Sequence, residues 1–203
     1  CIRDSCLATS GPTSWEYILL RVSVLEQSIA TVGRPNRAAI SNALELAKHC
    51  ESLGYERFWM SEHHNHATIV GTAPEILIAA IATSTQKIRV GSAGIMLPHY
   101  SAFKVAEQFR VLDALAPGRI DLGLGRAPGS DGRTAFALNP LANERPAQFP
   151  ADVRDLRAWL TGESLPEKHP FARLQAFPQG DTVPEIWILG SSNYGAQIAA
   201  HFG

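Results

Sequence analysis

Segments with the composition of β-strands alternate along this chain with segments that have helical periodicity. Apolar stretches rich in β-branched residues occupy residues 20–28, 56–61, 88–97, 119–125 and 185–189. Helical spacing is found between them, at residues 36–53, 72–83, 101–115 and 151–160, and Ser192 stands at the N-cap of a further helix. Since the strands are apolar on both faces and each is followed by a helix, the pattern predicts an α/β protein with a parallel sheet and right-handed crossovers.

Two closures of such a sheet are possible, an open doubly wound sheet and a (β/α)8 TIM barrel. The first connection, residues 28–35, lacks the glycine fingerprint of a dinucleotide-binding sheet, which favours the barrel. A complete barrel typically needs about 250 residues, and the 203 residues here contain five βα units. We therefore expect residues 20–203 to be the N-terminal part of a single TIM-barrel domain whose C-terminal units are missing, and residues 1–19 to be an irregular extension.

Two helix starts have recognisable capping residues. Thr72 precedes Ala73-Pro74, and Glu75 follows three residues after Thr72, which predicts a capping box with Thr72 as the N-cap. Ser101 is placed to cap the next helix, and Pro117-Gly118 to end it.

The net charge indicates which partners to expect, and the cysteines indicate the compartment. The formal net charge is −1, so no bulk electrostatic attraction to nucleic acid or to an anionic membrane is expected. The three cysteines have no metal-type spacing and are interpreted as free thiols in a reducing compartment. No apolar run has the length of a membrane span and no secretory signal pattern opens the chain, so a cytoplasmic protein is the default expectation.

The most chemically suggestive stretch is FWMSEHHNH, residues 58–66, in which an apolar strand leads directly into ionisable side chains. The carboxyl ends of parallel strands are where α/β proteins place their active sites. Function is favoured for His63, hydrogen bonding within the loop for His66, and both readings stay open for His64. Glu62 is equally compatible with orienting an imidazole and with a plain rim carboxylate. A zinc site is the rival reading, but neither HExxH nor CxxC spacing supports it.

A second candidate follows the fourth strand, where Arg126 lies in the glycine-rich segment GLGRAPGSDG. Its place at the carboxyl end of a strand favours a ligand contact over an ion pair with Asp121 or Asp131. Trp59, Trp159 and Trp187 lie in periodic segments and are expected in the core. Residues 129–149 and 166–184 are expected to be long loops.

The ordered set of motifs resembles the bacterial luciferase-like flavin monooxygenases, in particular oxidoreductases of unassigned substrate. The resemblance runs from about Val22 to Gly203. It rests on SVLEQS, LGYERFWMSEHH, IRVGSAGIMLPHYSAFKVAEQFRVLDALAPGRIDLGLGRAPGSD and WILGSSNYGAQIAAHFG. It implies a TIM barrel that uses reduced FMN and O2 on a small organic substrate, as a monooxygenase acting on paired donors.

The resemblance also implies roles for individual residues. His63 matches the family's active-site histidine, which assists the oxygen chemistry of the reduced flavin, and Glu62 and His64 are candidate catalytic residues beside it. An imidazole suits acid/base work because its unperturbed pKa lies near working pH. The cofactor-binding candidates are Ala93 and Gly94, at a non-prolyl cis peptide against the flavin ring, and Arg126, Ser191, Ser192 and Gly195 at its phosphate. Gly195 occupies a position where many relatives carry Ser or Thr.

Two alternatives stay open. One is a deazaflavin-dependent hydride-transfer oxidoreductase on the same barrel. The other is a truncated, non-catalytic flavin-binding relative. The resemblance further implies a homodimer packed through the early helices and a separate flavin reductase as partner.

Overall fold

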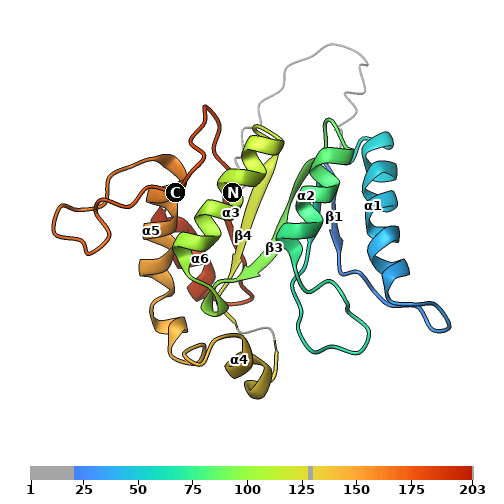
Figure 1. The fold of residues 1–203 in the computed structure, drawn as a ribbon, viewed down its shortest axis with the longest axis horizontal. Coiled ribbons are helices and arrows are strands. Elements are labelled where there is room, and N and C mark those ends of the chain that lie inside the picture. Colours follow the sequence, from blue (N-terminus) through green and yellow to red (C-terminus); the bar gives the residue numbers. More distant parts are fainter. Residues whose placement is uncertain (1–20, 128–129, 203) are drawn as a thin grey trace, which may run out of the picture.

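The strands form a single parallel sheet in a computed structural model that describes residues 21–127 and 130–202 (Figure 1). Its five strands lie in chain order: β1 (Ser23–Glu26), β2 (Arg57–Met60), β3 (Arg89–Met96), β4 (Ile120–Gly125) and β5 (Glu185–Ile188). Every neighbouring pair is parallel, as predicted. Within the described residues β1 pairs only with β2 and β5 only with β4, so the sheet does not close into a barrel. The predicted extension at residues 1–19 lies outside the described residues.

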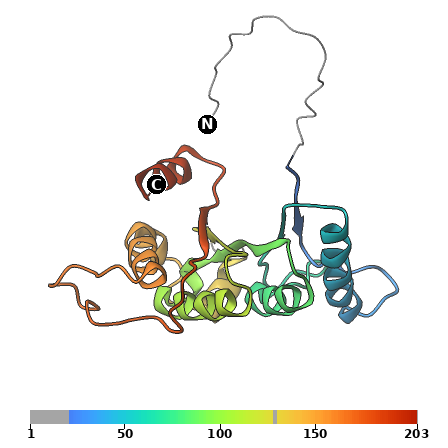
Figure 2. The same ribbon diagram turned by 90° about the horizontal axis from the view of Figure 1, so that it is seen from above.

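The crossovers are helical. The long helices are α1 (Arg37–Ser52), α2 (Pro74–Ser84), α3 (Ala102–Leu115), α5 (Phe149–Thr161) and α6 (Asn193–Phe202). Viewed from above, α1, α2, α3 and α5 line one side of the sheet, while β1 and β5 curve toward the other side (Figure 2). None of the helices in the described ranges is long and apolar enough to cross a membrane.

The hydrophobic core lies between the sheet and this helical layer. Apolar residues of β2, β3 and β4 pack there against α1, α2, α3 and α5; Phe58, Phe109, Ile120, Leu122, Leu124 and Leu156 are fully buried. The opposite face of the sheet is different, because Leu25 and Trp187 are exposed there. The expectation that Trp187 belongs to the core is therefore wrong in this structure, since no helical layer formed by the described residues covers its face of the sheet.

Two local predictions need correction and one is confirmed. The segment expected to be a loop at residues 129–149 contains helix α4 (Gly132–Leu138) and the 3-10 turn η2 (Arg145–Ala147), and a second 3-10 turn, η1 (Leu97–His99), follows β3. Thr72 does not cap α2: the N-cap is Ala73, with no side-chain hydrogen bond. Ser101 does cap α3, where its hydroxyl accepts a hydrogen bond from the Lys104 amide at 3.4 Å.

Candidate functional site

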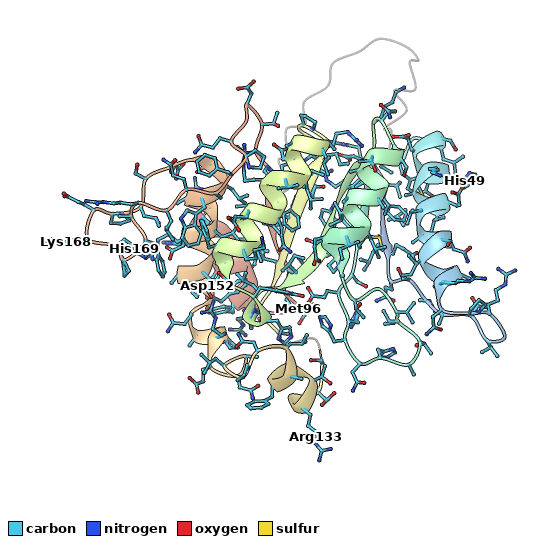
Figure 3. All side chains as sticks on the ribbon, in the orientation of Figure 1. His49, Met96, Arg133, Asp152, Lys168 and His169 are labelled. Atoms are coloured by element: carbon cyan, nitrogen blue, oxygen red, sulfur yellow. The ribbon has the colours of Figure 1, made fainter. Side chains whose placement is uncertain are left out.

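Glu62, two residues beyond β2, has a completely buried side chain. Its Oε1 accepts a hydrogen bond from the Tyr100 hydroxyl at 2.7 Å and lies 2.7 Å from His64 Nε2. Its Oε2 accepts from the backbone N–H of Met96 at 2.9 Å. Met96, labelled in Figure 3, is the last residue of β3. Glu62 therefore joins the carboxyl ends of two neighbouring strands. The reading of Glu62 as a plain rim carboxylate is therefore wrong, whereas a buried partner of an imidazole describes it.

The three histidines after Glu62 have different surroundings. His64 is committed to the Glu62 carboxylate. His66 accepts hydrogen bonds at Nδ1 from the amides of Thr68 and Ile69, so its expected role within the loop is confirmed. The half-buried imidazole of His63 makes no hydrogen bond to the described residues, and its ring lies 6.4 Å from that of His66. Of the three, His63 has the ring that is available to a ligand.

Electrostatic coupling extends from Glu62 to two further groups. Burial, reinforced by the charge of Glu62, raises the pKa of Tyr100 and keeps its phenol protonated. Burial also raises the pKa of Glu75, in the first turn of α2, and the charge of Glu62 adds to this effect. Glu62 thus has three hydrogen-bond partners and lies near two groups whose pKa values are raised.

The Ala93–Gly94 peptide in the middle of β3 is cis, as the resemblance implied. Its surroundings leave no room for a larger residue, because a Cβ on Gly94 would lie 2.6 Å from the Gly123 carbonyl oxygen and 2.8 Å from Leu189 Cδ1. Leu189 follows β5 and also lines the pocket described next. The cis peptide is therefore one side chain away from that pocket.

A pocket of about 130 Å³ lies between the carboxyl ends of β4 and β5. It brings together four of the residues predicted to contact phosphate: Arg126, Ser191, Ser192 and Gly195. The exposed guanidinium of Arg126 lies 4.1 Å from the centre of the Tyr194 ring. Ser191 and Ser192 precede the first turn of α6, whose N-terminal amides favour an anion.

Gly195 has a steric role in this turn. A Cβ on Gly195 would lie 3.2 Å from the Cα of Gly190, and the reverse contact is equally close. Gly195 brings no side-chain hydroxyl to this turn. Because it has no side chain, the α6 backbone can approach the end of β5 closely.

Charged residues also stand at the opposite edge of the sheet, where the amino ends of the strands lie, and there they pair with one another. The buried carboxylate of Asp121 accepts hydrogen bonds from Arg57 Nε at 3.1 Å, Arg89 Nε at 2.9 Å and Trp59 Nε1 at 2.8 Å. Both arginines also reach Glu185. Asp121 thus has its cations at the amino ends of the strands, and among the described residues Arg126 forms an ion pair with neither Asp121 nor Asp131.

Sequence reasoning missed two aromatic members of the site, Tyr100 and Tyr194. Tyr194 lies two residues from Ser192 in GSSNYG, and Tyr100 follows β3 by four residues. The only available signal was their position just beyond strands, since a tyrosine in a loop is otherwise common. No group of three His, Cys, Asp or Glu side chains within the described ranges could hold a metal ion.

Comparison with known proteins identifies the family. Residues 21–203 match the family described as luciferase-like monooxygenase, and the chain belongs to it. An N-acetyl-S-alkylcysteine monooxygenase from Bacillus subtilis is 43% identical over 185 residues, which cover 91% of this chain and 55% of that protein. The chain thus spans about half the length of the curated relatives it matches.

Solved structures agree on the fold. The crystal structure of apo-MsnO8 has a TM-score of 0.80 and 39% identity, covering 90% of this chain and 53% of the other. Two more distant structures share the fold alone. They are the FMN complex of the oxygenating constituent of 3,6-diketocamphane monooxygenase from Pseudomonas putida (22% identity, TM-score 0.68, 84% and 51% coverage) and an F420-dependent secondary alcohol dehydrogenase (16%, 0.70, 90% and 56%).

Proposed function

We propose that this chain supplies the flavin-binding half of a luciferase-like oxidoreductase that uses reduced FMN and O2 on a small organic substrate. The observation that carries the proposal is the pocket at Arg126, Ser191 and Ser192. It combines an exposed cation, two hydroxyls and the start of a helix at the carboxyl edge of a parallel sheet, which is where such folds bind phosphate groups.

The residues present fit an FMN phosphate. Arg126 has no carboxylate partner in the described part of the chain, so its guanidinium can form a charge-assisted hydrogen bond to a phosphate oxygen. The glycine contact at Gly190 and Gly195 lets the backbone of the turn come close to the ligand. The flavin, when bound, would supply the electrons with which O2 is activated.

The protein side chains have separate tasks in this proposal. Arg126, Ser191 and Ser192 hold the phosphate, and Tyr194 holds the Arg126 side chain through a cation–π contact. Ala93 and Gly94 provide a surface without bulky side chains for the ring. His63 gives or accepts a proton at the reacting atoms. Unlike the rings of His64 and His66, its imidazole makes no hydrogen bond to the described residues.

The test is an anaerobic titration of the full chain with FMN and then with photoreduced FMN, followed by rapid mixing with O2. We expect the chain to bind both forms of FMN. After mixing with O2, a transient absorbance should appear before the spectrum of reduced flavin has become that of oxidised flavin. FMN binding should weaken by about 10- to 100-fold in Arg126→Ala, and the transient should be lost in His63→Ala, which should still bind FMN. A well-folded chain that binds no FMN would refute the proposal.

A deazaflavin-dependent hydride transfer is the second candidate, and the fold shared with an F420-dependent alcohol dehydrogenase favours it. The same titration with F420 separates the two, because a deazaflavin that binds tightly while FMN does not would select hydride transfer. The proposal also carries the expectations of a separate flavin reductase, a homodimer and a cytoplasmic location. Flavin binding without a transient on mixing with O2 and without hydride transfer, in a folded chain, would leave the truncated, non-catalytic flavin-binding relative as the remaining reading.

A further inference from the structure

The buried carboxylate of Glu62 is the meeting point of three separate segments. Its donors come from the loop after β2 (His64), from the end of β3 (the Met96 amide) and from the residue that follows η1 (Tyr100). Removing a buried acceptor from several donors leaves each of them unsatisfied. This one carboxylate therefore ties the loop after β2 to the end of β3 and to Tyr100.

The donor set also fixes the protonation of His64. Its Nε2 faces a carboxylate oxygen at 2.7 Å, so that nitrogen carries a proton. The same oxygen receives the hydroxyl proton of Tyr100. Burial and the charge of Glu62 raise the pKa of the nearby Glu75 carboxyl group.

His63 lies between the two anchored residues. Glu62 precedes it and His64 follows it, and both side chains end in the same hydrogen bond. Its own amide donates to the Gly71 carbonyl at 3.4 Å across the base of the loop. The backbone on both sides of His63 is thus fixed, while its imidazole makes no hydrogen bond to the described residues.

We infer that Glu62 and Tyr100 are positioning residues for His63, an inference that rests on the proposed function for the role of His63 itself. They act through His64 and the end of β3, and neither touches the reacting atoms. On this inference Glu62 and His64, which the resemblance made candidate catalytic residues, place the His63 imidazole. Errors of about 1 Å in such placement cost about 100-fold in rate.

The first test reads the position of His63 directly. The full chain is labelled at histidine for NMR. The resonance of the His63 imidazole is assigned as the one that disappears in His63→Ala. We expect Tyr100→Phe and Glu62→Gln to shift and broaden that resonance. Tyr55→Phe is the matched control, because Tyr55 is also half-buried but packs against the core before β2. An unmoved His63 resonance in both network variants would overturn the inference, whatever the protein catalyses.

The second test uses photoreduced FMN and O2. We expect Tyr100→Phe and Glu62→Gln to bind FMN within twofold of the parent chain. The lifetime of the transient absorbance should shorten by about tenfold or more, toward that of His63→Ala. Tyr100→Phe is the milder variant and keeps the result interpretable if Glu62→Gln folds poorly.

The two tests separate the inference from the proposed function. Network variants that keep the parent lifetime, while His63→Ala loses it, would overturn the positioning role and leave the proposed function intact. If His63→Ala itself keeps the parent lifetime, the proposed role of His63 fails, and the NMR result alone decides whether Glu62 and Tyr100 hold that side chain in place.

Discussion

Arginines stand at both edges of the sheet, and their surroundings differ completely. At the amino edge, Arg57 and Arg89 share the buried carboxylate of Asp121 and reach Glu185. At the carboxyl edge, Arg126 lies over an aromatic ring in an open pocket, with no carboxylate partner among the described residues. The comparison teaches that a satisfied cation supports the fold, whereas an unsatisfied one beside hydroxyls and a helix start is available to a ligand.

The largest expected effect is on folding, from loss of the carboxylate at the amino edge. Asp121→Asn leaves Arg57 and Arg89 without their buried counter-charge, and removing one partner of such a cluster costs about 3 kcal/mol. Urea unfolding measures this loss, and the folded fraction should bind FMN with unchanged affinity. Glu185→Gln is the control, since that side chain is half exposed and should cost less than about 1 kcal/mol. Equal losses of unfolding free energy in the two variants would contradict the assignment of Asp121 as the main counter-charge of the two arginines.

Arg126→Ala tests the carboxyl edge. Because a charge-assisted contact to phosphate is worth about 1.5–3 kcal/mol, FMN affinity should fall by about 10- to 100-fold while the urea midpoint stays the same. Isothermal titration gives the affinity, and Arg126→Lys should be intermediate because it keeps the charge but loses the planar fork. The control is Arg133→Ala, an exposed arginine on α4 (Figure 3). If Arg133→Ala weakens binding as much as Arg126→Ala, the pocket has no special role.

A smaller effect is expected from the glycine pair of the β5–α6 turn. Gly195→Ala places a methyl group 3.2 Å from Gly190 Cα, so the turn must open by a few tenths of an ångström. FMN affinity should fall a few-fold, as measured by titration. In Gly132→Ala the added methyl meets nothing within 4 Å, and binding should not change. A Gly195→Ala chain with parent affinity would show that the turn adapts without loss.

The smallest effect concerns pH at the amino edge. Glu51 accepts hydrogen bonds from the amides of Gln86, Lys87 and Ile88; burial opposes ionisation, but these bonds lower the pKa of Glu51 below 4.5. Its contribution to stability is therefore present above about pH 4.5 and is lost as the pH falls through the lowered value. Thermal melts between pH 3 and 6 should show a weaker acid dependence in Glu51→Gln. An unchanged slope would mean that the bonds do not distinguish the charged form.

The sequence predicted the sheet well because strand and helix periodicities are local. The parallel order and the clustering of Arg126 with Ser191 and Ser192 follow from placing residues just beyond strands. Long-range contacts could not be read in this way. Tyr100 meets Glu62 across 38 positions, and nothing local to either residue signals the pair. Thr72 failed as a cap for a similar reason, because the capping pattern does not encode the path of the chain around Pro74.

Two buried side chains of α3 anchor the last part of the long connection before β5. Arg110 on α3 donates to the carbonyl oxygens of Pro178 and Thr182 at 2.8 and 2.6 Å, and Asp113 accepts from the Thr182 hydroxyl at 2.7 Å. Lys168 lies well before this anchor, on a loop that extends away from the helices (Figure 3).

It follows that covalent continuity of the chain at Lys168 is dispensable for the seating of β5. A single tryptic cut there should yield two fragments that elute together in size-exclusion chromatography and keep their affinity for FMN. In Arg110→Ala the same cut should release the C-terminal fragment. The path of the chain into β5 is thus held by a guanidinium on a neighbouring helix together with the pairing of β5 and β4.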